Sequence, residues 1–86
     1  MASYSLIWRR SAEKELRALP KDAIARLVAL AESLRENPFP QGTRKLVNSE
    51  HAYRLRSGDY RIVYTVEGNR LTVEVVRVAH RKEAYR

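Results

Sequence analysis

Hydrophobic and polar residues alternate near the start of the chain and over its second half, with a helical repeat between the two. The first alternating stretch is Tyr4–Arg9, in which Tyr4, Leu6 and Trp8 share one parity. Alternation is typical of a half-buried strand, because successive side chains of a strand point to opposite faces of the sheet. We therefore expect a first strand over Tyr4–Arg9.

Two short helices are predicted after this strand. Ser11 is a suitable N-cap for the first helix, and Ala12 and Leu16 fall on one face of it before Pro20 interrupts the pattern. The second helix has the hydrophobic spacing of an amphipathic helix, at Ile24, Leu27, Val28, Ala31 and Leu34. Because the two helices are adjacent around Pro20, they are expected to form a hairpin.

A stretch with prolines and a glycine, from Asn37 to Glu50, predicts a loop that contains the basic pair Arg44-Lys45. Three strands joined by short glycine-containing turns are expected after it, over Tyr53–Arg56, Tyr60–Val66 and Leu71–Ala79. Strands joined in this way pair antiparallel. The expected fold class is α+β, with an N-terminal strand, a two-helix hairpin and a three-stranded antiparallel meander. The first strand is added at one edge, and residues 1–86 form a single domain.

The charge of the chain indicates an anionic partner. It has 17 Lys and Arg against 10 Asp and Glu, a net charge of +7, and 13 of the 17 basic residues are Arg. Arginine binds phosphate through parallel hydrogen bonds and stacks on bases. Nucleic acid or an acidic protein is therefore the expected partner.

Several other kinds of site are not expected. The chain has no cysteine, so it has no disulfide and no thiolate metal site, and its two histidines lack the spacing of a metal motif. No metal site is predicted. No hydrophobic run approaches the roughly 20 residues of a membrane span. With no membrane segment and no export signal, a cytoplasmic location is expected.

Strand alternation brings several arginines together. Arg54 and Arg56 share one face of their strand, and Arg61 lies opposite the apolar face of the next strand. With the apolar faces against the helices, these three side chains are expected to converge on the open face of the sheet. On the last strand, Arg77 lies on the face to which Arg81 would also point if the alternation continued.

The simpler interpretation of an arginine is a solvated side chain or an ion pair with a carboxylate such as that of Glu67. For Arg70, in a turn, that interpretation is preferred, and for Arg56 and Arg77 the two interpretations are equally supported. A phosphate-binding role is preferred for the converging residues Arg54, Arg61 and Arg81.

Two further side chains near the C-terminus can carry chemistry. His80, where the last strand ends, can act as an acid or base near neutral pH, or it can simply form a hydrogen bond at the strand end. From the residues alone the structural role of His80 is preferred. Tyr85 can pack on the sheet, donate a hydrogen bond to a phosphate or stack on a base.

Two passages together resemble the RelE branch of the RelE/ParE toxin superfamily: YRLRSGDYRIVY over residues 53–64 and AHRKEAYR over residues 79–86. The N-terminal half agrees in kind, so the resemblance covers essentially the whole chain. It implies a small α+β toxin of a bacterial toxin–antitoxin pair that enters the ribosomal A site and cuts mRNA there. The attack is by the 2′-hydroxyl of the RNA itself, so the resemblance implies no metal and no cofactor.

The resemblance also implies roles for individual residues. Arg61 and Arg81 match the phosphate-stabilising arginines of the family, and Tyr85 matches its C-terminal tyrosine. The best-known RelE pattern has two lysines where this chain has Ala52 and Arg54. Because an arginine stays protonated and is a poor general base, proton transfer is expected to shift to His80 or Tyr85. The expected catalytic set is Arg61, Arg81, Tyr85 and His80, and the expected RNA-binding set is Arg54, Arg56, Arg44, Lys45 and Arg77.

Two other functions stay open. The ParE branch shares the fold and blocks DNA gyrase without cutting mRNA, although its members generally lack the complete set of Arg61, Arg81 and Tyr85. A basic nucleic-acid-binding module without catalysis would bind RNA in a salt-dependent way and leave it uncut. The expected partners are a cognate antitoxin, acidic or with an amphipathic helix, the small ribosomal subunit with its mRNA, and operator DNA contacted through the antitoxin.

Overall fold

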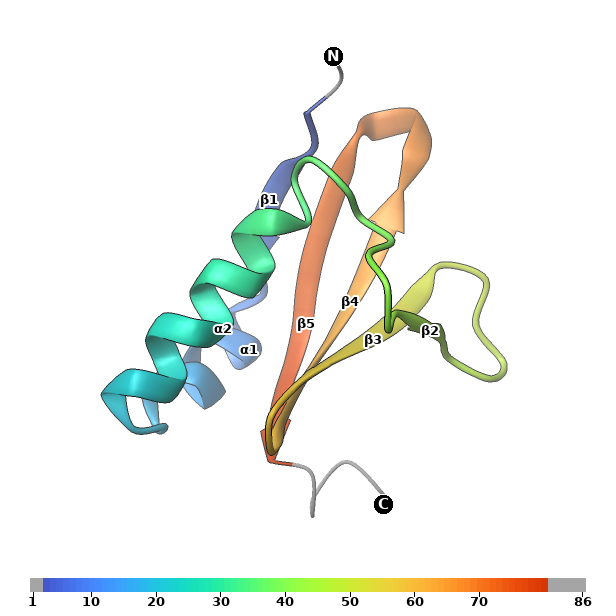
Figure 1. Ribbon diagram of the computed structural model, residues 1–86. Coiled ribbons are helices and arrows are strands. Elements are labelled where there is room, and N and C mark those ends of the chain that lie inside the picture. Colours follow the sequence, from blue (N-terminus) through green and yellow to red (C-terminus); the bar gives the residue numbers. More distant parts are fainter. Residues whose placement is uncertain (1–2, 81–86) are drawn as a thin grey trace.

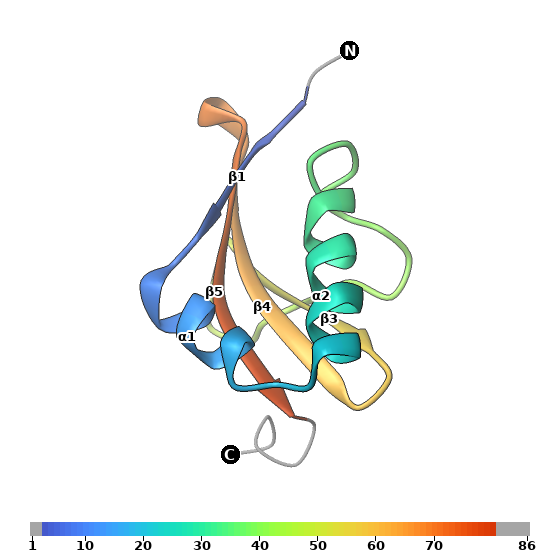
Figure 2. The same ribbon diagram turned by 90° about the vertical axis from the view of Figure 1, so that its left-hand side faces the viewer.

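The computed structural model describes residues 3–80, which form a five-stranded sheet with two helices on one face (Figures 1 and 2). We call the face that packs against the helices the helix face, and the opposite face the outer face. The expected α+β class is confirmed. The elements are β1 (Ser5–Trp8), α1 (Arg10–Arg17), α2 (Lys21–Ser33), β2 (Arg44–Lys45), β3 (Ala52–Ser57), β4 (Tyr60–Glu67), the 3-10 turn Gly68–Arg70 and β5 (Thr72–His80).

The strands lie in the order β1-β5-β4-β3-β2. The neighbours β3, β4 and β5 pair antiparallel, as expected for strands joined by short turns. β1 lies at one edge, as predicted, and it pairs parallel with β5. At the other edge, β2 falls inside the stretch expected to be a loop. A strand of two residues is too short for alternation to reveal it.

The helices cover the sheet with small and branched side chains. α2 buries Leu27 and Ala31 of its predicted hydrophobic stripe, together with Ala23. Val28, which the spacing also assigned to the buried face, is exposed. The prediction of an N-cap at Ser11 is wrong, because α1 already starts at Arg10 and the N-cap position falls on Arg9, whose side chain forms no capping bond. Instead, β1 runs directly into α1, so the backbone of Arg9 is held by the sheet.

One hydrophobic core joins both helices to the helix face of the sheet. Its largest fully buried side chains are Tyr64, Leu27, Leu34, Ile62, Val73 and Val75. Ile62 and Tyr64 of β4 point into this core. Arg61 directly precedes Ile62 on the same strand, so its side chain faces away from the helices. None of the helices within residues 3–80 has both the length and the apolar character that a membrane crossing requires.

A β-bulge in β5 changes which of its residues face outwards. Val63 lies opposite Arg77, whereas the next residue, Tyr64, lies opposite Val75, so Val76 is the extra residue. Strict alternation would place Arg77 on the same face as Val75, in the core. The bulge instead turns Arg77 to the outer face, where a charged group can be solvated.

Candidate nucleic-acid interface

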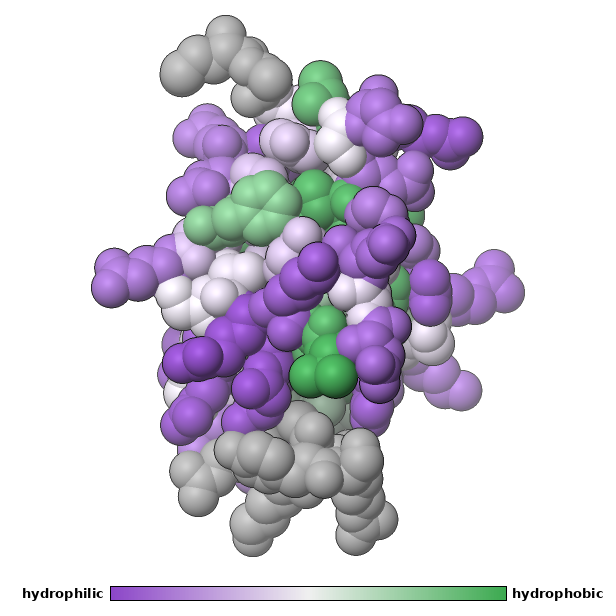
Figure 3. All heavy atoms as spheres, turned by 90° about the vertical axis from the view of Figure 1, so that its right-hand side faces the viewer, coloured by the Kyte–Doolittle hydropathy of each residue, from purple (hydrophilic) through white to green (hydrophobic). Residues whose placement is uncertain are grey.

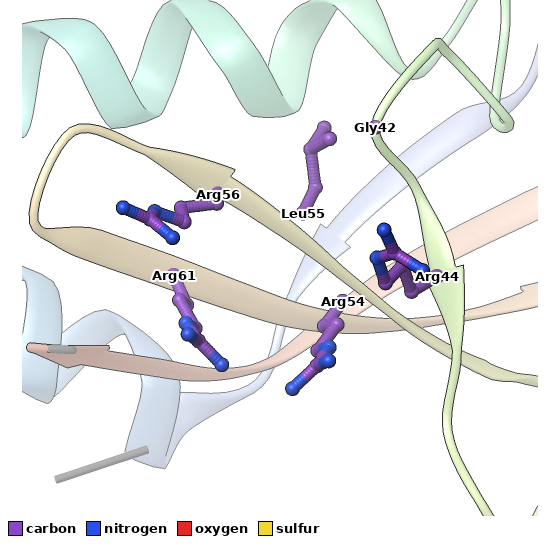
Figure 4. Close-up of a pocket in the computed structure, with 6 residues that line it drawn as sticks. All are labelled: Gly42, Arg44, Arg54, Leu55, Arg56 and Arg61. Atoms are coloured by element: carbon purple, nitrogen blue, oxygen red, sulfur yellow. The ribbon is translucent and has the colours of Figure 1, made fainter. Parts of the chain in front are cut away.

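Four arginines from three strands lie side by side on the outer face: Arg44, Arg54, Arg56 and Arg61 (Figure 4). We call them the arginine cluster. Arg44 of β2 is directly opposite Arg54 of β3, and Arg56 of β3 is directly opposite Arg61 of β4. The three arginines predicted from alternation to share a face therefore do so, and β2 adds the fourth.

The turn between β3 and β4 sets the register of these pairs. Ser57 pairs with Tyr60, which leaves Gly58 and Asp59 as the two central residues of the turn. Gly58 has a φ of 60°, and glycine at the first central position with positive φ is the signature of a type II′ hairpin turn. A slip of one residue would move a whole row of side chains to the other face.

The arginine cluster concentrates positive charge. Within residues 3–80, no carboxylate oxygen lies within 4.0 Å of a guanidinium nitrogen of Arg44, Arg54 or Arg56. Like charges directly opposite each other on antiparallel strands are destabilising. Figure 3, from the side of the molecule away from the helices, shows hydrophilic side chains over much of this side. A bound anion would reduce this repulsion.

Arg61 differs from its neighbours in its burial. Its residue surface is 6% exposed, and its Nε and Nη1 atoms are shielded from solvent. A guanidinium stays protonated, so this is a cation held largely out of water. Burying a cation is costly unless hydrogen bonds or counter-charges compensate, and such positions are often functional.

A small pocket of about 120 Å³ lies at the arginine cluster, lined by its four arginines together with Gly42 and Leu55. Pockets that enclose small-molecule ligands start at roughly 300 Å³. The pocket is therefore too small to enclose a whole nucleotide.

A buried tyrosine holds the loop that leads to Arg44. The hydroxyl of Tyr64 donates a hydrogen bond to the carbonyl oxygen of Pro38 at 2.8 Å and lies 3.2 Å from the hydroxyl oxygen of Thr43. Burial raises the pKa of Tyr64, and the hydrogen bond with Thr43 acts in the opposite direction. Because Thr43 directly precedes Arg44, this clamp fixes β2 against the sheet.

Two residues of the predicted RNA-binding set lie apart from the arginine cluster. Lys45 alternates with Arg44 and lies opposite Tyr53, which faces the other side of the sheet. Arg77 lies on the outer face, but its Nε is 3.7 Å from a carboxylate oxygen of Glu15 on α1. The ion pair draws Arg77 toward the edge of β5.

His80 lies on the helix face, away from the arginine cluster. It is directly opposite Tyr60, and the two rings meet edge to face with their centroids 5.4 Å apart. The preceding residue, Ala79, is the one opposite Arg61. By strand alternation, the side chains of His80 and Arg61 therefore point to opposite faces of the sheet. The predicted positions Arg81 and Tyr85 lie outside the described residues.

Two structural contacts were not found from the sequence. Glu15 accepts a hydrogen bond from the backbone N–H of Val78 at 2.8 Å, in addition to pairing with Arg77. The hydroxyl of Tyr64 closes the loop described above. The sequence does hold one indication of the role of Glu15. This residue directly precedes the buried Leu16, so it lies at the margin of the hydrophobic stripe of α1. Among the residues that the structure describes, no three His, Asp or Glu side chains are grouped to hold a metal ion.

Residues 6–85 match the family described as ParE toxin of the type II toxin–antitoxin system parDE. The chain belongs to this toxin family. The Toxin RelE of Mycobacterium tuberculosis is 30% identical over 84 residues, which cover 96% of this chain and 87% of that one. The expected resemblance to RelE is confirmed, and the chain is a RelE-like type II toxin.

Solved structures agree with this assignment. The toxin–antitoxin complex RelBE2 of Mycobacterium tuberculosis matches with a TM-score of 0.83 and 28% identity, over 94% of each chain. The archaeal RelE–RelB complex of Pyrococcus horikoshii OT3 matches with a TM-score of 0.82 and 26% identity. The match covers 92% of the present chain and 96% of the archaeal one. The toxin therefore has the RelE fold over nearly its whole length.

Proposed function

We propose that the toxin is a ribosome-dependent mRNA endonuclease, and that the arginine cluster holds the RNA backbone at the cut. The observation that carries this proposal is the buried cation of Arg61 beside three further arginines, at a pocket of the size of one phosphate. RelE relatives support the class of activity.

The proposed reaction is a transfer within the RNA. The 2′-hydroxyl oxygen attacks the adjacent phosphorus, a new P–O2′ bond forms, and the bond to the 5′-oxygen of the next nucleotide breaks. The products are a 2′,3′-cyclic phosphate and a free 5′-hydroxyl. A base takes the proton of the 2′-hydroxyl, and an acid returns a proton to the leaving oxygen. No metal or cofactor takes part in these steps.

Each residue has a role in this proposal. Arg61 and Arg81 stabilise the negative charge that develops on the phosphate oxygens. Arg54 binds and orients the backbone, because its guanidinium stays protonated and cannot accept a proton. Tyr85 takes part in the proton transfer. We leave His80 out of the reacting set, since it lies on the other face from Arg61.

The proposed partner of the toxin is a cognate antitoxin. Relatives of this toxin have been solved as complexes, RelBE2 of Mycobacterium tuberculosis and RelE–RelB of Pyrococcus horikoshii. An acidic or amphipathic antitoxin that covers the arginine cluster would compete with RNA for the same charges. The small ribosomal subunit with its mRNA, and operator DNA reached through the antitoxin, complete the proposed set of partners.

Inhibition of DNA gyrase without RNA cleavage is the second candidate function. The family description that matches the chain carries the ParE name, which favours it. This candidate predicts that supercoiling by gyrase stops while mRNA stays intact. A basic RNA-binding module predicts binding without either effect.

The test is a reconstituted translation reaction read by primer extension on the mRNA, with and without ribosomes. Cuts at codon-spaced positions that require translating ribosomes support the proposal. Intact mRNA with normal translation would overturn it, and a gyrase supercoiling assay would then test the second candidate.

A further inference from the structure

We propose that Phe39, with Tyr53 and Lys45, forms a base-stacking platform for single-stranded RNA at the edge of the sheet, on the opposite face from the arginine cluster. The inference rests on the proposed function, because it extends the path of the RNA beyond the phosphate held by the arginines. It adds a contact with a base to the contacts with the backbone.

Phe39 is an aromatic side chain held at the surface. Its residue surface is 50% exposed, although phenylalanine is normally buried. Its ring packs edge to face on Tyr53, with the centroids 5.0 Å apart, and Tyr53 in turn lies 5.9 Å from the buried ring of Tyr64. The three rings form a series that runs from the surface into the core.

The backbone around Phe39 is restrained by two prolines and two hydrogen bonds. Phe39 stands between Pro38 and Pro40, and a residue before proline is restricted to extended conformations. Its N–H donates to the side-chain oxygen of Asn37 at 3.1 Å, and the carbonyl of Pro38 accepts the bond from Tyr64. These contacts restrain the backbone that carries the ring, which lowers the entropic cost of stacking.

A cation lies on the same side of the sheet as these rings. Lys45 is directly opposite Tyr53, and side chains opposite each other on antiparallel strands have their Cβ atoms about 5 Å apart. An exposed ring beside a basic side chain fits a nucleotide, whose base stacks and whose phosphate pairs with the cation. The core of a protein–protein interface, by contrast, is depleted of lysine.

The two-residue strand β2 connects this platform with the arginine cluster. Consecutive residues of a strand point to opposite faces, so Arg44 joins the cluster and Lys45 joins the aromatic side. An RNA chain that crosses the short edge strand β2 could contact both. The two surfaces thus form one path for a flexible single strand.

The experiment measures binding of the toxin to a short 2′-O-methyl RNA that carries fluorescein and one 2-aminopurine, over a range of salt concentrations. The 2′-O-methyl groups prevent cleavage. Phe39→Leu, which keeps an apolar side chain but removes the flat ring, is expected to weaken binding about 5- to 100-fold. Phe39→Tyr is expected to restore it. Ile7→Ala is the control, because Ile7 is 49% exposed at the opposite edge strand, β1.

The salt dependence separates stacking from charge. Loss of a phosphate contact in Arg44→Gln should lower the slope of log K against log salt by about 0.7, whereas Phe39→Leu should leave the slope unchanged. Stacking should also quench the 2-aminopurine of RNA bound to the wild type and not of RNA bound to Phe39→Leu.

Two outcomes overturn the inference. One is no RNA binding by the wild type, and the other is equal RNA binding by Phe39→Leu and wild type. If Phe39→Leu also loses complex formation with the cognate antitoxin in the second case, the surface is a protein-docking site. None of these removes ribosome-dependent cleavage, so the proposed function can stand if the platform fails.

Discussion

Arg56 of β3 and Arg61 of β4 lie directly opposite each other, so two cations form one cross-strand pair. Arg54, at the next outward position of β3, lies directly opposite Arg44 of β2 in the same way. A sheet selected for stability alone would place opposite charges at such pairs. An anion bound between them, as proposed above, would lower this repulsion.

The first prediction concerns the repulsion itself. Arg44→Gln should raise the free energy of unfolding by about 0.2–1 kcal/mol at low salt, because it removes one of two facing cations. The gain should shrink at high salt, where surface charges are screened. Urea unfolding at both salt concentrations measures it.

Arg70→Gln is the matched control for Arg44→Gln. Arg70 is an exposed arginine near Glu67, with its Nε 3.7 Å from the carboxylate oxygen, so its removal should not stabilise the toxin. A lower stability of Arg44→Gln at low salt would show that the cluster is not strained by its charge.

The second prediction concerns the clamp on the loop. Tyr64→Phe leaves the buried carbonyl oxygen of Pro38 without its hydroxyl donor, which should cost about 1–3 kcal/mol of stability. Urea unfolding at neutral pH measures the loss. Thr43→Val, which removes the other hydroxyl of the clamp, should cost less, since the hydroxyl of Tyr64 keeps its bond to Pro38.

The third prediction concerns alkaline pH. Burial raises the pKa of Tyr64 above its ordinary value of 10.0, so the folded state favours the neutral phenol. This contribution to stability is complete below pH 10 and is lost as pH rises through 10 toward the folded pKa. The difference in stability between wild type and Tyr64→Phe should therefore narrow above pH 10. A difference that widens there would contradict the assigned direction.

The fourth prediction concerns Glu15, whose carboxylate binds the Val78 N–H at 2.8 Å. β1 pairs with β5 only up to Val75. Beyond that point, Glu15 provides the acceptor for the Val78 N–H that a neighbouring strand would otherwise provide. Glu15→Leu leaves the N–H of the buried Val78 unsatisfied and should cost about 1–3 kcal/mol. Glu15→Gln keeps an acceptor oxygen and should cost less.

Glu13→Leu is the control for Glu15→Leu. Glu13 lies on the same helix and pairs with Arg17 at the surface, so its loss should cost only about 0.2–0.5 kcal/mol. Equal losses in urea unfolding for the two leucine variants would mean that the bond to Val78 contributes little.

The sequence was sufficient to predict most of the fold and part of the site. Alternation placed Arg54, Arg56 and Arg61 on one face, because β3 and β4 are regular and joined by a two-residue turn. Alternation could not show which residues of β5 face outwards, because both of its parities are apolar and the bulge at Val76 shifts the parity. No periodicity marks such an insertion.

Other features depend on contacts between distant parts of the chain. β2 has two residues and is defined by its pairing with β3 rather than by a pattern. His80 and Arg61 point to opposite faces because His80 pairs with Tyr60 and Ala79 pairs with Arg61. In the sequence, His80 stands next to Arg81, which suggested that it lies with the arginines. The carboxylate of Glu15 and the hydroxyl of Tyr64 find partners 63 and 26 residues away.

The central claim is that the buried cation of Arg61 stabilises the reacting phosphate. Its most direct test is the single-turnover rate of mRNA cleavage on programmed ribosomes, for wild type, Arg61→Gln and Arg70→Gln, with folding checked by circular dichroism. We predict a rate lower by about 100-fold or more for Arg61→Gln, and an unchanged rate for Arg70→Gln. A folded Arg61→Gln variant that cleaves at the wild-type rate would contradict the claim.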